Sequence, residues 1–222
     1  MNTPTHLNHQ TLRDRQRELS DILPESLSVR VHRALSWLDR AEQETGDDDA
    51  RFIFLWVAFN AAYSQDIADR QRFDERQLFQ GFLGRLIDSD ADQLLYELVW
   101  DQFSGAIRLL IDNQYVFQPF WDYHNGRKTE AQWQLAFQSS KTAAHRAMGQ
   151  MDTLKVMGIM FDRLYTLRNQ LLHGGATWNG RVNRKQIFQG AEIMGRVVPI
   201  VIHLMMSDHQ RVWGNACYPV VD

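Results

Sequence analysis

Cysteine is nearly absent from this sequence, because the 222 residues contain only one, Cys217. A single cysteine excludes a disulfide within the chain and a zinc site built on several thiolates. The histidines form no His-Glu-x-x-His pair or other close cluster, so we expect no metal site. Glycine-rich phosphate loops and a Gly-x-Ser-x-Gly elbow are also missing, which argues against common nucleotide-binding and hydrolase chemistries and predicts that no cofactor is bound.

Long apolar runs are missing as well. No apolar run is as long as a membrane-spanning helix, which needs about 18 residues. The nearest stretch, 197–206, is short and contains Pro199 and His203. The N-terminal residues lack the basic and then apolar layout of an export signal. We therefore expect a cytoplasmic protein without a membrane span, in agreement with its cysteine content.

The sequence does contain enough apolar material for a folded core, with 44% hydrophobic and 11% aromatic residues. This composition is typical of a globular protein and differs from that of a disordered chain. Together with the length, it predicts a single domain over 1–222. We expect a core over about 26–206, a helical N-terminal extension over 1–24 and a C-terminal tail over 207–222.

Charge is unevenly spread along the chain. Residues 1–112 hold 20 acidic and 12 basic side chains, whereas residues 113–222 hold 7 acidic and 12 basic ones. Only four of the 24 basic residues are lysine. Arginine is a planar, forked donor that suits phosphate, so the second half is compatible with an anionic ligand. A general bias in amino-acid usage explains the arginine content equally well.

Apolar residues recur with helical spacing, and sustained alternation of β-branched residues is absent. We therefore predict an all-α fold, a bundle of about seven to eight helices. These cover 11–23, 26–44, 51–65, 67–88, 91–113, 129–148, 151–173 and 183–206. Residues 113–126 carry Pro119 and five aromatic side chains. We interpret them as a packed loop whose rings either join the core or form a surface on which bases stack.

The segment 51–65 is apolar on nearly every side, which is typical of a helix in the middle of a bundle. Asn60 is its only strongly polar residue between Phe52 and Tyr63. A buried amide needs hydrogen-bond partners inside the protein. Asn60 is therefore either a core residue that fixes helix packing or a residue that orients the side chains of a candidate site.

That candidate site lies at the end of the long predicted helix 151–173. On a wheel of about 100° per residue, one arc of this helix is apolar. The arc contains Leu154, Met157, Met160, Phe161, Leu164, Leu167, Leu171 and Leu172, and the opposite polar band contains Asp162, Thr166, Asn169 and His173. Arg168 points into the apolar arc, where a guanidinium must be paired or face a cleft.

Arg168 and His173 are five residues apart, so their side chains diverge by about 140° on an ideal helix. One way for them to act together is that the helix unwinds at His173, since Gly174 and Gly175 form a strong helix stop. The other is that a second copy of the chain supplies the complement in a two-fold dimer. Either arrangement places Arg168, Asn169 and His173 at the edge of a cleft.

An arginine and a histidine suit the cleavage of RNA by transesterification. The arginine clamps the phosphate, and the histidine moves the proton of the 2′-hydroxyl or of the leaving oxygen, without a metal ion. Arg181, Arg184 and Lys185 gather at the start of the last predicted helix. We regard these three residues as candidates for RNA binding.

At these residues the sequence resembles the HEPN superfamily. Arg168-Asn169-x-x-x-His173 matches its Arg-x4-6-His motif, with the polar residue that commonly follows the arginine. The segment 55–63, Leu-Trp-Val-Ala-Phe-Asn-Ala-Ala-Tyr, looks like the early core helix of many bacterial members. The resemblance covers mainly 51–65 and 160–205, and residues 66–150 carry no signature of the family.

The resemblance implies a HEPN-like core that forms a homodimer through the helix 151–173 and brings two motifs into one cleft. It also implies a metal-independent endoribonuclease, often a toxin of a toxin–antitoxin pair or a component of phage defence, with Arg168 and His173 catalytic and Asn169 polarising or orienting. A nucleotidyltransferase-like antitoxin is an implied partner. The tyrosine that such partners modify, two residues after the histidine, is Gly175 here, so direct binding is the expected contact.

Two other functions fit the same residues. A non-catalytic HEPN-like module would bind RNA, a nucleotide or a partner protein through the cleft and the aromatic loop. A helical scaffold would use Arg168 as a structural arginine, buried against a carboxylate, with His173 far from any cleft.

Overall fold

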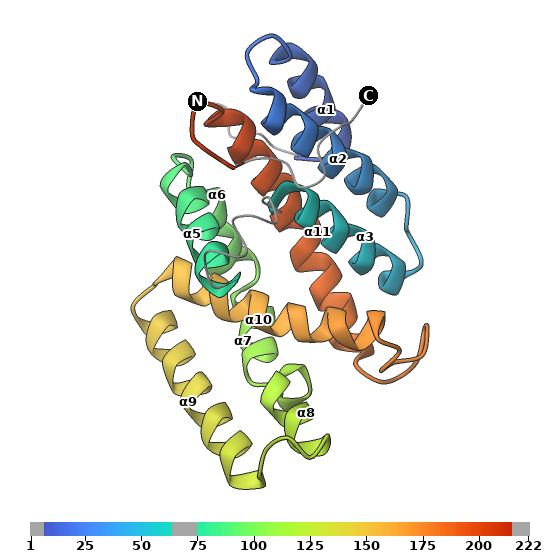
Figure 1. The fold of residues 1–222 in the computed structure, drawn as a ribbon, viewed down its shortest axis with the longest axis vertical. Helices are drawn as coiled ribbons and strands as arrows, with labels where there is room; N and C mark the ends of the chain where they lie inside the picture. Colours follow the sequence, from blue (N-terminus) through green and yellow to red (C-terminus); the bar gives the residue numbers. More distant parts are fainter. Residues whose placement is uncertain (1–6, 64–74, 215–222) are drawn as a thin grey trace. The chain divides into compact units, whose positions relative to one another are not determined.

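The computed structural model describes residues 7–63 and 75–214 (Figure 1). Every regular element among them is a helix, which confirms the all-α prediction. These residues contain ten α-helices, a π-helical turn and a short 3-10 helix, more than the seven or eight expected. They divide into two compact units, with boundaries after Leu94 and before Ala191. The single domain over 1–222 stays a prediction.

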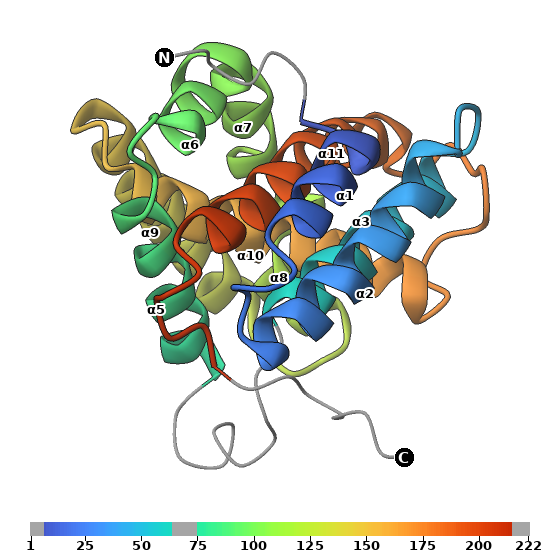
Figure 2. The same ribbon diagram turned by 90° about the horizontal axis from the view of Figure 1, so that it is seen from above.

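The first unit contains α1 (His9–Glu18), α2 (Glu25–Glu42), α3 (Asp48–Tyr63), α5 (Glu75–Asp88) and the part of α11 (Arg184–Ser207) from Ala191 onward. α2 packs along α3, and α1 lies against α2 (Figure 2). α1 begins with a capping box, in which the side chains of Asn8 and Thr11 each accept a backbone hydrogen bond. The apolar stripe of α2 is buried as its spacing predicts, and includes Leu27, Val31, Ala34, Leu35 and Leu38.

Arg30 is a buried charge in the first unit that its sequence context did not reveal. This α2 residue is 1% exposed. Its guanidinium donates to the carbonyl of Ala62 in α3 and to the carbonyls of Trp213 and Gly214 after α11. Burial, and then the charge of Arg85, lower the pKa of Arg30 to about 10, so the side chain stays charged at neutral pH. One cation thus joins three parts of the unit.

The helix α3 has one fully buried face, whereas its composition predicted burial nearly all round. Phe52, Leu55 and Phe59 belong to that face. Val57 and Asn60 are only half-buried. The amide of Asn60 is therefore not forced to find its partners in the core, because solvent reaches it. Its role in orienting the candidate site stays a prediction.

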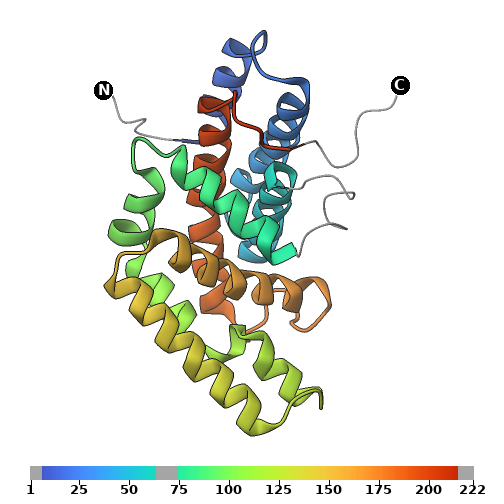
Figure 3. The ribbon, with the colours of Figure 1, turned by 60° about the vertical axis from the view of Figure 1, so that its left-hand side comes forward.

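The second unit contains η1 (Leu98–Gln102), α7 (Ser104–Ile111), η2 (Gln114–Val116), α8 (Gln118–His124), α9 (Glu130–Gly149) and α10 (Thr153–Leu172). α8 packs against α9, and α10 packs against α9, α7 and η2 (Figure 3). α9 begins with a capping box of Thr129 and Gln132. The start of α11 completes this unit.

Three predicted segments differ from the structure. The helix expected over 11–23 is α1, which covers His9–Glu18 and is followed by turns up to Leu23. The helix expected over 91–113 is divided into α6 (Leu94–Glu97), η1 and α7, because η1 is a π-helical turn and the backbone leaves the helical region at Phe103. The loop expected over 113–126 contains α8, since Pro119 stands in the first turn, where a missing N–H costs no hydrogen bond. These divisions explain the larger number of helices.

Some predictions lie outside the described residues. They concern residues 1–6 of the N-terminal extension, residues 64–74 with the start of the helix expected over 67–88, and residues 215–222 of the tail with Cys217.

One described helix, α11, is long and apolar enough to cross a membrane by length and composition alone. Its apolar window is 72% buried within the structure. Burial of this kind is what the core helix of a folded protein shows, so this single helix is weak evidence for a membrane span.

His203 on α11 is a buried titratable group in the first unit, with an exposed fraction of 6%. Nη1 of Arg15 lies 3.1 Å from its Nδ1. Because a guanidinium only donates, Nδ1 accepts this hydrogen bond. Burial, and then the charge of Arg15, lower the pKa of His203 from 6.5 to about 4.

We predict that His203 makes the free energy of unfolding decrease as the pH falls from 6.5 to about 4. In this window the unfolded chain takes up a proton at His203 and the folded chain does not, so unfolding is favoured. Urea unfolding at a series of pH values measures the decrease. It should be smaller in His203→Gln, whereas the control His124→Gln, at an exposed histidine, should follow the wild type. An unchanged pH profile in His203→Gln would contradict the prediction.

Candidate functional site

The helix α10 ends at the point that the two glycines predict. His173 is its C-cap, and the backbone N–H of His173 still donates to the carbonyl of Asn169 at 3.0 Å. Gly174 then adopts a φ of +71°. The N–H groups of Gly174 and Gly175 donate back to the carbonyls of Leu171 and Gln170. This pair of hydrogen bonds is a Schellman motif, in which a glycine takes the left-handed conformation.

The helix ends at His173, whose N–H still makes a helical hydrogen bond while its φ of −97° and ψ of 14° leave the helical region. Two side chains five residues apart on one helix point about 140° away from each other. His173 is exposed and Arg168 is half-buried. On an ideal helix these two side chains therefore leave in different directions, and their exposure differs in the structure.

Arg168 is held by a neutral amide. Its Nη1 donates to Oδ1 of Asn169 at 2.9 Å, and its guanidinium lies 5.8 Å from the ring centroid of Tyr165. Its Nε is buried and has no acceptor among the described residues. Within the same part of the chain, no carboxylate forms an ion pair with Arg168. The positive charge of Arg168 is therefore not cancelled there by a neighbouring anion.

Arg163 is the buried arginine of α10, whereas the helical wheel predicted that Arg168 points into the apolar arc. Arg163 is 2% exposed, and its Nη2 donates to Oγ of Ser140 at 3.0 Å and to the carbonyl of Ile111 at 3.4 Å. Its guanidinium lies 4.3 Å from the ring centroid of Phe117. Burial lowers the pKa of Arg163 to about 10, against the opposing effect of nearby aspartates.

A signal for Arg163 was present in the sequence. Val156, Met160, Arg163 and Leu167 follow one another at intervals of four, three and four residues, the spacing of core positions on a helix. All four side chains are buried. An arginine in such a series indicates a satisfied internal charge.

The two faces predicted for α10 need two corrections. Met157, Phe161 and Leu164 are buried as expected. Thr166 was placed in the polar band but is buried, because its hydroxyl donates to the carbonyl of Asp162 at 3.1 Å and needs no water. Leu172 was placed in the apolar arc but is 46% exposed, since it lies in the last turn.

The three candidates for RNA binding have different surroundings. Arg181 is exposed in the loop before α11. Arg184 is half-buried, and its Nε donates to the carbonyl of Gly180 at 3.1 Å, so it supports the loop. Lys185 is exposed and lines a hollow. Lys185 is thus the cation of this group that is best placed to meet a ligand.

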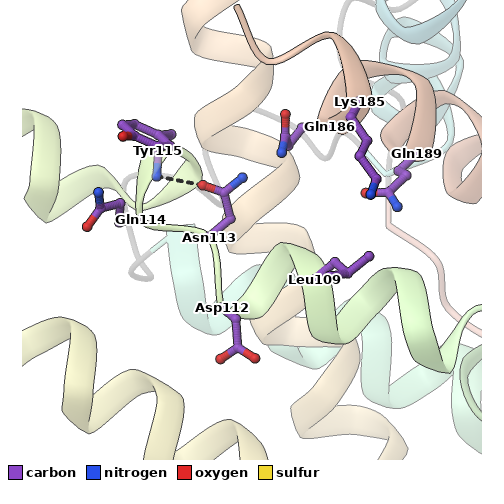
Figure 4. A pocket seen from close by; sticks show the side chains of 8 residues that line it. All are labelled: Leu109, Asp112, Asn113, Gln114, Tyr115, Lys185, Gln186 and Gln189. Carbon is purple, nitrogen blue, oxygen red and sulfur yellow. Dashed lines mark hydrogen bonds between the residues drawn. The ribbon is translucent and has the colours of Figure 1, made fainter.

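The hollow beside Lys185 has a volume of about 450 Å³ and lies between the segment 109–115 and the start of α11 (Figure 4). Its lining residues are Leu109, Asp112, Asn113, Gln114, Tyr115, Lys185, Gln186 and Gln189. In Figure 4 the side chain of Asn113 lies across from Lys185 and Gln189, whereas Asp112 points away. Amides that donate and accept hydrogen bonds, with one lysine, characterise this surface.

Hydrogen bonds join this hollow to the end of α10. Nε2 of Gln170 donates to the carbonyl of Tyr115 at 2.6 Å, and Oε1 of Gln170 accepts from Nδ2 of Asn183 at 2.6 Å. Nε1 of Trp121 also donates to the carbonyl of Tyr115, at 2.8 Å. Gln170 therefore positions both a wall of the hollow and the loop that follows the motif. The positioning role of Gln170 was not predicted from the sequence, because its partners Tyr115 and Asn183 are distant in the chain.

Two of the five aromatic side chains over 113–126 belong to the core, and Trp121 and Tyr123 are half-buried. Phe117 and Phe120 are buried, and the rings of Phe120 and Trp133 lie 5.1 Å apart in an edge-to-face arrangement. Tyr115 differs, since it is 48% exposed and lines the hollow. Of the two interpretations, core packing applies to the buried rings, and a stacking surface is left to Tyr115.

Asp112 at the rim of the hollow is already paired. Its Oδ1 lies 2.9 Å from Nζ of Lys141 and 3.4 Å from Nε2 of His145. Burial raises its pKa, but the hydrogen bonds and charges of Lys141 and His145 outweigh this effect and hold the pKa of Asp112 below its usual range. Within residues 7–63 and 75–214, no three His, Cys, Asp or Glu side chains gather as a metal ion requires.

Comparison of the chain with protein-family models, with curated proteins and with solved structures finds no match. The function is therefore argued from the side chains of the site.

We predict that Gly174→Ala lowers the free energy of unfolding by about 1 kcal/mol, because a Cβ is strained in the left-handed conformation that ends α10. The control is Gly105→Ala in α7, where φ is not positive and the space around the new Cβ is open. Alanine should stabilise that helix by up to about 1 kcal/mol. Urea unfolding of both variants measures the difference. Equal effects at the two glycines would contradict the assigned role of Gly174.

Proposed function

We propose that this chain is an endoribonuclease with a HEPN-like core that cleaves RNA by transesterification and needs no metal ion. The observation that supports it most is the state of Arg168, which is held by Asn169 and has no carboxylate partner among the described residues. His173 is exposed at the end of the same helix. An arginine without a carboxylate partner among the described residues suits a phosphate ligand.

In the proposed reaction the 2′-oxygen of a ribose attacks the adjacent phosphorus. The bond from the 2′-oxygen to phosphorus forms and the bond from phosphorus to the 5′-oxygen breaks, which leaves a 2′,3′-cyclic phosphate and a 5′-hydroxyl. His173 takes the proton of the 2′-hydroxyl, or gives a proton to the leaving oxygen. Arg168 donates to the non-bridging oxygens, whose negative charge grows in the transition state. Asn169 orients Arg168.

We propose that the active site is shared between two copies of the chain. The support comes from the divergence of Arg168 and His173 along a continuous helix. A two-fold axis close to the end of α10 brings the Arg168 of each copy toward the His173 of the other. Each of the two sites then takes its arginine from one copy and its histidine from the other.

The test of cleavage is incubation of the purified protein with a mixed RNA pool in EDTA, with analysis of the 3′ ends. We expect cleavage that leaves 2′,3′-cyclic phosphates. Arg168→Ala and His173→Ala should each lower the rate by about 100-fold or more, as the loss of a charge-stabilising or proton-transferring group does. Arg146→Ala, at an exposed arginine of α9, is the matched control and should cleave like the wild type. Wild-type rates in both site variants would contradict the proposal.

A mixing experiment tests the shared site. Arg168→Ala and His173→Ala chains are each expected to be inactive, and equal amounts of both are allowed to exchange subunits. Half of the dimers are then mixed, and each mixed dimer keeps one site with an intact arginine and an intact histidine. About a quarter of the wild-type activity should therefore return. If the mixture stays inactive although exchange is complete, each site belongs to one chain.

A second candidate function is the binding of RNA or a nucleotide without cleavage. The observation that favours it is the hollow beside Lys185, because its amides suit the edges of bases and the exposed ring of Tyr115 suits stacking. RNA that is bound tightly by the wild type and stays intact in the cleavage assay would support this function against the first.

The resemblance to HEPN proteins also suggests a biological role for the proposed endoribonuclease. We propose a toxin or a component of phage defence that acts on cytoplasmic RNA. A nucleotidyltransferase-like antitoxin is the proposed partner. It would act by direct contact, because Gly175 stands where modified toxins have a tyrosine.

A further inference from the structure

A second hollow lies in the first unit, against the helices α1 and α2 that pack side by side (Figure 2). Its volume is about 380 Å³. The lining residues are Arg13, Gln16, Arg17, Ser20, Ser28, Val29, His32 and Arg33. None of them takes part in the function proposed above.

The lining of this hollow is strongly basic. Three arginines and a histidine line it, and none of the lining residues is acidic. A carboxylate does contact one of these arginines, since Oδ1 of Asp14 lies 3.1 Å from Nη1 of the exposed Arg17. Like charges around one small space repel each other unless an anion enters it.

Arg13 is the best-positioned cation of the hollow. Its Nη1 donates to Oε1 of Gln16 at 2.8 Å. Gln16 is only 8% exposed, and its Nε2 donates to the carbonyl of Ser28 at 3.4 Å. This buried amide connects Arg13 on α1 with α2 and restricts the guanidinium to one place. Side chains that are held before a ligand arrives lose little entropy on binding.

The contact between Arg13 and His32 also points to an anion. Nη1 of Arg13 lies 2.9 Å from Nδ1 of His32. A guanidinium has no acceptor, so Nδ1 accepts and the remaining hydrogen of the neutral ring is on Nε2, which can donate. Among the described residues, no carboxylate pairs with Arg13. Both side chains of this basic pair therefore bring donors to the hollow.

We propose that this hollow binds a phosphate group, either as free phosphate or as the terminal phosphate of a nucleotide. The guanidinium groups of Arg13 and Arg17 supply planar, forked donors, and Ser28 lines the same space. Ser20 lines it as well, but its hydroxyl donates to Oδ1 of Asp21 at 3.3 Å. A tetrahedral oxyanion presents several acceptor oxygens in different directions and can use donors from both helices at once.

Isothermal titration of the full chain with inorganic phosphate, adenosine monophosphate and adenosine tests the proposal. We expect phosphate and the monophosphate to bind and adenosine not to bind. Arg13→Gln should weaken phosphate binding by about tenfold or more, because a charged hydrogen-bond donor is lost. Arg17→Gln, at an exposed position, should weaken phosphate binding by a smaller factor. If Arg13→Gln does not fold, the Arg17→Gln variant tests the proposal instead. Arg146→Gln on α9 is the control and should bind like the wild type.

The relative affinities for phosphate and for adenosine monophosphate show whether the hollow binds free phosphate or a nucleotide. Equal affinity for phosphate and for the monophosphate means that the phosphate group alone is recognised, and tighter binding of the monophosphate means that the site takes a nucleotide. The proposal is wrong if adenosine binds as well as the monophosphate, if the wild type binds no phosphate, or if the folded arginine variants bind it unchanged. RNA cleavage does not enter this assay, so its result is independent of the endoribonuclease test.

Discussion

The contacts of the buried guanidinium of Arg163 join four segments of the second unit. The guanidinium connects α10 to the end of α7 through the carbonyl of Ile111, to α9 through Ser140, and to the segment before α8 through the ring of Phe117. A charge in the interior is tolerated only with such partners, because burial removes its hydration. These contacts hold the second half of α10 in place, and Arg168 and His173 follow about one and a half and about three turns further along the same helix.

Two arginines five residues apart on α10 thus have different physical roles. Arg163 is fully buried and donates through Nη2 to Ser140 and Ile111, whereas Arg168 is half-buried and donates to the amide of Asn169 near the ring of Tyr165. The Nε of each has no acceptor among the described residues. The helix end adds a second constraint. Since α10 keeps its hydrogen bonds up to His173 and stops at Gly174, the histidine is exposed at the very end of the helix, whereas Arg168 is half-buried more than a turn before it. The proposed sharing of the site between two chains follows from this geometry.

Much of the helical organisation was predictable from the sequence, because helices depend on local spacing and on local signals. The predicted helix 129–148 is α9, which begins at the Thr129 cap, and 151–173 is α10, which ends at the glycine pair. Where the helices differ from the prediction, the causes are local backbone features that the hydrophobic pattern does not reveal. A π-helical turn divides the helix expected over 91–113, and Pro119 starts a short helix inside the expected loop.

The sequence by itself determined the all-helical fold, most of the apolar stripe of α10 and the end of that helix, since each follows from residues within a few turns of one another. Tertiary structure decided which charges are buried and what surrounds the candidate residues. Arg30 finds partners in α3 and after α11, Gln170 reaches Tyr115, and Arg13 meets His32 on the next helix. Such partners lie tens to almost two hundred residues away along the chain. Only folding brings them together, so no spacing rule could have named them.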